Sequence, residues 1–191
     1  MSKEILEQLF DSLVKVRLLK LFLRNPNDFF ELSEIVKRIK SSAPACRSQI
    51  NKLESISLIK SKIKNKKKEY SINRDFDFYN ELKTLVLKSS PASKKKILKR
   101  LKDLGRINLA ILSGIFVNAE NSRIDLLVVG DAIKQAKLSS FFNDLEAEIG
   151  KEIDYVLLST KDFKYRYEMF DRFILDVLEK PHEKLINKLK I

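Results

Sequence analysis

The sequence predicts an α+β protein of two domains. Residues 1–88 are expected to be mostly helical with one β-hairpin, and residues 107–191 to form an α/β domain with a small mixed sheet. The first observation is an alternating pattern over residues 59–72 that interrupts otherwise helical periodicity. The second is a change, from residue 108, to continuous apolar runs of strand length separated by helical segments. Residues 89–106 are expected to hold the linker and a basic helix.

Charge is the third observation, because it is unevenly distributed between these segments. The net charge of the 191 residues is +12, with +8 in residues 1–88, +6 in residues 89–106 and −2 in residues 107–191. Such a basic chain is expected to bind a polyanion, with nucleic acid before an anionic membrane surface. The basic and the nearly neutral segments are therefore expected to do different jobs.

Composition excludes several other classes. A hydrophobic content of 44% is enough for a packed core and excludes global disorder. No apolar run approaches the roughly 20 residues of a membrane span, and the N-terminus has no apolar signal core. We expect a cytoplasmic protein without a membrane partner. The single Cys46 and single His182 exclude an internal disulfide and a Cys/His zinc site, and no cofactor is expected.

The first 40 residues predict three helices. Residues 3–10 form a short one, and Ser12 is placed to cap a second one whose apolar surface is broad enough to be buried on most sides. Ser33 is expected to cap the third, over residues 33–40, and a three-residue turn follows it.

The segment around residues 44–55 predicts an amphipathic helix that Ser42 opens, with Pro44 near its first turn. Cys46, Ile50 and Leu53 fall at i, i+4 and i+7 and form an apolar stripe, so Cys46 is interpreted as a small buried hydrophobe rather than a redox switch. The opposite face is polar, basic and free of carboxylates, and carries Arg47, Ser48, Asn51 and Lys52.

A lysine-rich hairpin is predicted next. Ile59, Ser61 and Ile63 alternate with lysines, which predicts a strand whose Ile59 and Ile63 share a half-buried face. A tight turn is expected at residues 65–67, and Tyr70 and Ile72 share one face of the return strand. Six lysines precede the first acid, Glu69, and a negatively charged partner is the simplest reason to keep such like charges together. The alternative is a solvated surface.

A basic helix followed by a basic hairpin predicts duplex-DNA binding. The helix, at about residues 44–55, would enter the major groove, and the hairpin, at about residues 60–70, would lie along the phosphates. The candidate DNA-binding residues are Ser42, Arg47, Ser48, Asn51, Lys52, Lys62, Lys64, Lys66, Lys67 and Lys68.

A helix with an apolar face, a linker and a basic helix follow the hairpin. A helix over residues 76–88 places Phe78, Leu82 and Leu85 on one face, either for a homodimer interface or for packing on its own domain. Residues 89–93 are interpreted as the linker. The basic helix after it, within residues 94–106, either adds a second phosphate contact or neutralises an acidic surface.

The second half predicts a small sheet covered by helices. The expected elements are strands at 109–116, 124–130 and 153–159, helices at 132–149 and 161–179, and a final short helix from Pro181.

Residues 11–88 resemble the winged-helix domains of the arsenical-repressor-like transcriptional regulators. The resemblance rests on the helix order, the segment APACRSQINKLESISLI and the lysine hairpin, and it covers about 40% of the chain. It implies DNA binding and often a dimer. The metal-sensing members use cysteine and histidine clusters, which this chain lacks, and Ser57 replaces the glycine usual before the wing.

Residues 107–180 look like the minimal nucleotidyltransferase domain of the DNA polymerase beta superfamily. The resemblance is carried by SGIFVNAENSRIDLLVVGD and KEIDYVLLS, and it implies that Gly114 matches the motif glycine, Asp125 the second metal-binding acid and Asp154 the third. In the family these acids hold two divalent ions. Here Arg123 stands in place of the first acid and Ile115 in place of a small phosphate-cradling residue. These departures imply that the domain keeps the nucleotidyltransferase fold without its catalytic activity.

Three functions follow from these patterns. The leading hypothesis is a transcriptional regulator that reads duplex DNA, its C-terminal domain serving for ligand sensing, dimerisation or partner binding. The second is an active Mg²⁺-dependent nucleotidyltransferase that a winged helix delivers to its substrate. The third is a binding module whose C-terminal domain binds a nucleotide or a protein.

Overall fold

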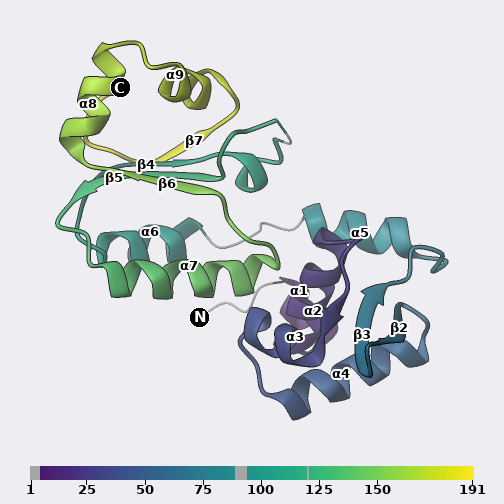
Figure 1. The fold of residues 1–191 in the computed structure, drawn as a ribbon. Coiled ribbons are helices and arrows are strands. Elements are labelled where there is room, and N and C mark those ends of the chain that lie inside the picture. Colours follow the sequence, from purple (N-terminus) through teal and green to yellow (C-terminus); the bar gives the residue numbers. More distant parts are fainter. Residues whose placement is uncertain (1–4, 89–93, 120) are drawn as a thin grey trace. The chain divides into compact units, whose positions relative to one another are not determined.

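The protein is α+β with two separate β-sheets, as the sequence predicts (Figure 1). The computed structural model describes residues 5–88, 94–119 and 121–191. The predicted linker at 89–93 lies outside the described residues. The described residues form two compact units, of which the first lies within residues 1–90 and 143–151 and the second within residues 91–142 and 152–191.

The first unit is built from helices around a three-stranded antiparallel sheet with strand order β1-β3-β2. Its elements are α1 (Ile5–Phe10), α2 (Leu13–Arg24), β1 (Phe30–Glu31), α3 (Leu32–Ile39), α4 (Ala43–Ser55), β2 (Ile59–Lys64), β3 (Lys67–Ile72) and α5 (Tyr79–Lys88). These elements match the expected order of helices and hairpin. β1 adds a short third strand that the sequence pattern did not indicate.

Helix α2 forms the centre of the first unit. The Ser12 hydroxyl accepts a hydrogen bond from the Lys15 amide at 3.2 Å, so Ser12 caps this helix as predicted. Seven of its 12 residues are buried, which agrees with the broad apolar surface in the sequence. Phe22 meets Phe30 of β1 edge to face, with ring centroids 5.8 Å apart.

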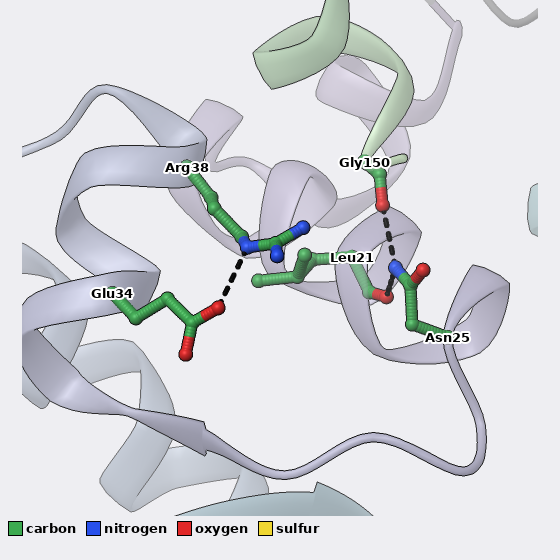
Figure 2. A network of polar contacts seen from close by, with 5 residues as sticks. All are labelled: Leu21, Asn25, Glu34, Arg38 and Gly150. Carbon is green, nitrogen blue, oxygen red and sulfur yellow. Dashed lines mark hydrogen bonds and ion pairs between the residues drawn. The ribbon is translucent and has the colours of Figure 1, made fainter. Parts of the chain in front are cut away.

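Helix α3 begins one residue earlier than predicted. Glu31 occupies the N-cap position and makes no side-chain capping bond, while Ser33 lies inside the first turn, so the prediction of Ser33 as the cap is wrong. Because Phe30 and Glu31 pair with β3, the helix starts directly after this short strand. Within α3, Arg38 donates to Glu34 at 2.9 Å in an i, i+4 pair (Figure 2).

Gly150 makes a close approach to α2 within the first unit. Asn25 at the end of α2 donates its side-chain amide both to the Leu21 carbonyl, at 2.6 Å, and to the Gly150 carbonyl, at 2.7 Å (Figure 2). Gly150 has φ +85, and a Cβ there would lie 2.5 Å from the Lys20 carbonyl carbon. Only glycine fits both the backbone angle and the space.

Helix α5 exposes part of its apolar face. Tyr79 and Val86 are buried, and Leu82 packs against the core of the first unit. Phe78 and Leu85, which the sequence places on the same face as Leu82, are 65% and 45% exposed. The predicted face is therefore only partly used for packing within the unit.

The second unit has a four-stranded mixed sheet with order β6-β5-β4-β7, in which β5 and β6 are parallel and the other pairs antiparallel. Its elements are α6 (Lys94–Lys102), β4 (Arg106–Leu112), the 3₁₀ turn η1 (Gly114–Phe116), β5 (Leu126–Asp131), α7 (Gln135–Ile149), β6 (Tyr155–Leu158), α8 (Thr160–Glu168), α9 (Arg172–Glu179) and β7 (Glu183–Asn187). The last residues of α7 belong to the first unit.

The final segment is a strand, so the predicted short helix from Pro181 is wrong. Residues of β7 pair antiparallel with β4, with Ile186 opposite Ala110. The buried β4 leaves a free sheet edge on the side away from β5, and β7 satisfies the backbone groups there. The helical propensity of this short polar segment stabilises it less than these backbone hydrogen bonds do.

The sheet of the second unit is covered on both faces. Figure 1 shows α6 and the first part of α7 on one face, and α8 and α9 on the other. On the latter face Phe163, Ile174 and Val177 join the buried side chains of β4 and β5 in one apolar cluster. Among the described helices of both units, none is long and apolar enough to span a bilayer.

Candidate nucleic-acid interface

Helix α4 presents the predicted polar face to solvent. The Ser42 hydroxyl accepts from the Ala45 amide at 3.4 Å, and Pro44 lies in the first turn. Cys46, Ile50 and Leu53 are buried at 4% exposure or less, and burial raises the pKa of the Cys46 thiol, which disfavours a reactive thiolate. Because this stripe is fixed in the core, the opposite face is exposed, with Arg47, Ser48, Asn51 and Lys52.

The hairpin of β2 and β3 forms at the predicted strand positions. Its two-residue loop, Asn65 and Lys66, has φ values of 50 and 63, which match the twist of the strands. Ser57, which precedes the hairpin, also has a positive φ, of 61, and so adopts a conformation that favours glycine. Ile63 is 80% exposed, so the expectation that it shares a half-buried face with Ile59 is wrong. The tip of the hairpin extends beyond the core that covers Ile59.

A groove of about 500 Å³ separates α4 from the hairpin. Its lining residues come from β1, the start of α3, the exposed face of α4, and β3, and they are Glu31, Leu32, Ser33, Arg47, Asn51, Lys67, Lys68 and Tyr70. Four of the predicted DNA-binding residues therefore meet in one concave surface. The other six, Ser42, Ser48, Lys52, Lys62, Lys64 and Lys66, do not line this groove.

Sequence reasoning missed Glu31 and Ser33 as groove residues. Ser33 looked like a helix cap, whereas its place in the first turn of α3 puts it in the lining. Glu31 carries the only acidic side chain among the lining residues. No local pattern connects residues 31–33 with residues 67–68, because they meet through pairing of β1 with β3.

Most lysines of the hairpin have acidic partners in the folded protein. The four ion pairs are Lys60–Asp75 at 2.9 Å, Lys62–Glu69 at 3.6 Å, Lys67–Glu31 at 2.9 Å and Lys68–Glu54 at 3.2 Å. These four lysines therefore have an acid close by, so the expectation that they lack one is wrong. Three of the acids come from outside the hairpin, and tertiary folding brings them to it.

The cations without such partners lie at the hairpin tip and on α4. Within the part of the chain that the structure describes, Lys64, Lys66, Arg47 and Lys52 form no ion pair. The Lys67 ammonium group donates to Glu31, and this carboxylate raises the pKa of Lys67, so its charge is kept across the physiological pH range. Exposed pairs of this kind are weak and exchange readily for another anion.

The nucleotidyltransferase-like residues meet at the start of β5, in the second unit. Both carboxylate oxygens of Asp125 accept backbone N–H groups, Oδ1 from Ile115 at 2.8 Å and Oδ2 from Asp154 at 3.1 Å. Gly114 has φ +51, and a Cβ there would lie 2.1 Å from Oδ1 of Asp125. The Asp125 carboxylate therefore links the η1 turn to the beginning of β6 through hydrogen bonds. Gly114 leaves space for this carboxylate because it has no side chain.

The same residues do not fit a divalent metal ion. Arg123, at the position of the first acid, forms an ion pair with Asp176 of α9 at 2.6 Å. A Mg²⁺ site needs several carboxylate oxygens directed at one point, whereas the oxygens of Asp125 are directed at backbone amides. Across residues 5–88, 94–119 and 121–191, no group of three or more His, Cys, Asp or Glu side chains is arranged to hold a metal.

Comparison with known proteins adds no family to this description. No protein-family model matches the chain, and neither a curated protein nor a solved structure matches it.

Proposed function

We propose that the protein is a transcriptional regulator that binds duplex DNA through a winged helix-turn-helix. In this proposal α3 and α4 are the two helices of the motif, α4 enters the major groove, and the β2–β3 hairpin lies along the phosphates. The observation that carries the proposal is the groove that joins Arg47 and Asn51 of α4 to Lys67 and Lys68 of the hairpin. A concave basic surface beside an exposed polar helix is suited to a sugar-phosphate backbone next to base edges.

Roles can be divided between the two parts of this surface. Arg and Asn form bidentate hydrogen bonds with guanine and adenine respectively, so Arg47 and Asn51 are assigned to base reading. The lysines of the hairpin are point charges on long flexible chains and are assigned to phosphates. The second unit contributes binding rather than chemistry, because the carboxylate of Asp125 is occupied by backbone amides.

Selection of bound duplexes from a random pool tests the proposal. The selection uses excess competitor DNA at about 150 mM salt, close to physiological ionic strength. Enrichment of a defined motif supports sequence reading, and a two-fold symmetric motif would indicate a dimer with a measurable half-site spacing. Binding that only falls with salt, without enrichment, would contradict the assignment of α4 to base reading.

Lys66→Gln is expected to weaken binding to all duplexes alike. Lys66 lies at the hairpin tip and forms no ion pair within the described residues, so its charge is available for a phosphate. The slope of log K against log salt should become shallower by about 0.9, the value for one phosphate contact. Fluorescence anisotropy titrations at several salt concentrations, on two unrelated duplexes, measure this. A loss confined to one of the two duplexes would count against a backbone contact.

Glu31→Gln is expected to strengthen binding to all duplexes. The carboxylate of Glu31 lies in the groove and pairs with Lys67, so it competes with phosphate for that cation and repels the DNA. The gain should be up to about fivefold in affinity, because an exposed ion pair of this kind is weak. The same titrations measure the change. Glu81→Gln on α5 removes an equal charge away from the groove and is expected to change affinity little; an equal gain in both variants would contradict the specific role of Glu31.

A further inference from the structure

Helix α6 presents a row of three lysines to solvent. Lys95, Lys99 and Lys102 are spaced i, i+4 and i+7 and are all exposed, while Ile97 and Leu101 on the opposite side are buried in the second unit. Residues with this spacing lie on one face of a helix. The basic character of this segment is therefore concentrated in a surface stripe.

Other basic side chains of α6 contact groups within the protein, whereas the three lysines of the row, called the lysine stripe below, do not do so among the described residues. Lys94 forms an ion pair with Glu183 of β7, and the Arg100 guanidinium lies 5.5 Å from the centroid of the Phe141 ring. Within the described residues, the side chains of Lys95, Lys99 and Lys102 have no acidic partner. This differs from the hairpin, where four lysines are neutralised within the protein.

This arrangement is unfavourable for an isolated helix. Lys94, Lys95 and Lys96 occupy the first turn, where the helix dipole favours negative charge, and that turn contains no acid. Lys95–Lys99 is a like-charge i, i+4 pair, and Lys99–Lys102 is a like-charge i, i+3 pair. A negatively charged partner outside the protein would relieve both effects at once.

The length of the stripe and its surroundings favour a nucleic-acid backbone. Seven residues of α-helix rise about 10 Å, the axial length that about three phosphates of one DNA strand occupy. An anionic membrane is the other candidate, but a helix that lies on a bilayer needs an exposed apolar face. Of the three apolar residues of α6, Ile97 and Leu101 are buried and Leu98 is half-buried, so the helix has no fully exposed apolar face.

We propose that Lys95, Lys99 and Lys102 form a second phosphate-binding surface, which contacts the backbone of duplex DNA without reading its sequence. The inference rests on the proposed function, since the duplex is the one that α4 and the hairpin bind. It assigns a binding role to the second unit and predicts that this unit contributes about three phosphate contacts to the salt dependence.

The test compares the full-length protein with two triple variants. Lys95→Gln, Lys99→Gln and Lys102→Gln together remove the stripe. Lys161→Gln, Lys164→Gln and Arg172→Gln remove three exposed cations elsewhere on the same unit and serve as the control. Dissociation constants for a 40-base-pair duplex are measured from 50 to 200 mM KCl. The stripe variant should show a slope shallower by about 2.7, so its affinity falls about 40-fold less over this range, while the control keeps the wild-type slope.

The outcomes separate this inference from the proposed function. If Lys66→Gln makes the slope shallower but the stripe variant does not, the α6 surface is overturned and the proposed function stands. If the stripe variant makes it shallower and Lys66→Gln does not, the α6 surface stands and the role of the hairpin fails. Binding to phosphatidylserine vesicles that requires the stripe, with no change in the DNA slope, overturns the inference.

A charge-retaining variant excludes a structural effect. Lys95→Arg, Lys99→Arg and Lys102→Arg together keep the three charges and should keep the wild-type slope. A shallower slope in this variant would overturn the assignment, because the effect would then not depend on charge. The thermal unfolding midpoint of the Arg variant should match that of the wild type, since the charges are kept and the three side chains are exposed. The Gln variant should unfold at the same or a slightly higher temperature, because it removes the like-charge pairs.

Discussion

Replacing Asp125 by Ala is expected to lower the free energy of unfolding by about 2–3 kcal/mol, because two N–H groups lose a charged acceptor. These are the amides of Ile115 and Asp154, which Asp125 holds at 2.8 and 3.1 Å. The η1 turn and the start of β6 would each lose the hydrogen bond that joins them to the Asp125 side chain, while the backbone pairing of β5 with β6 remains. Urea unfolding, followed by far-ultraviolet circular dichroism, measures the change.

Asp154→Ala is the matched control for this prediction. The backbone amide of Asp154 donates to Asp125, but its own side chain is exposed and takes no part in that contact. The control should therefore leave stability nearly unchanged. If both aspartates were metal ligands of an active nucleotidyltransferase, both variants would abolish transfer from a labelled nucleoside triphosphate and neither would need to unfold the protein. Incorporation of a nucleotide by the wild type, lost in both variants, would contradict the structural role assigned to Asp125.

Arg47→Ala is expected to reduce discrimination at one base of the selected site by about 1–3 kcal/mol, or about 5- to 150-fold in relative affinity. Arg47 is exposed in the N-terminal half of α4 and lines the groove, and its guanidinium is suited to a bidentate contact with guanine. The measurement is competition between the best site and a version with that base pair replaced. Stability should stay within about 0.5 kcal/mol of wild type, because the side chain is exposed and forms no ion pair in the described chain.

Lys66→Gln is the comparison for Arg47→Ala. Both remove one positive charge from the proposed interface, but only Arg47 is assigned to a base. The Lys66 variant should lose affinity on both competing sites equally, while the Arg47 variant loses it mainly on the best one. Equal losses on both sites for both variants would remove the base-reading role of Arg47 and leave a basic surface that contacts only the backbone.

The sequence alone determined the elements whose signals are local. The Ser42 and Ser12 caps, the buried stripe Cys46, Ile50 and Leu53, and the strands of the hairpin were all readable from short-range spacing. Capping bonds span three residues and helix faces repeat every three to four, so neither depends on distant parts of the chain. The exposed face of α4 followed directly, because burial of one face leaves the other in solvent.

Only the tertiary structure decided which groups meet across the fold. It placed Glu31, Glu54 and Asp75 on hairpin lysines that look unpaired in the sequence, and it exposed Ile63 at a tip that the core does not reach. It converted the expected C-terminal helix into β7, because the edge of β4 needed hydrogen-bond partners. It also directed the carboxylate of Asp125 at backbone amides. The ion pairs, the β4–β7 ladder and the hydrogen bonds of Asp125 join residues from different elements, and the exposure of Ile63 depends on where the core ends. None of this information is carried by local spacing.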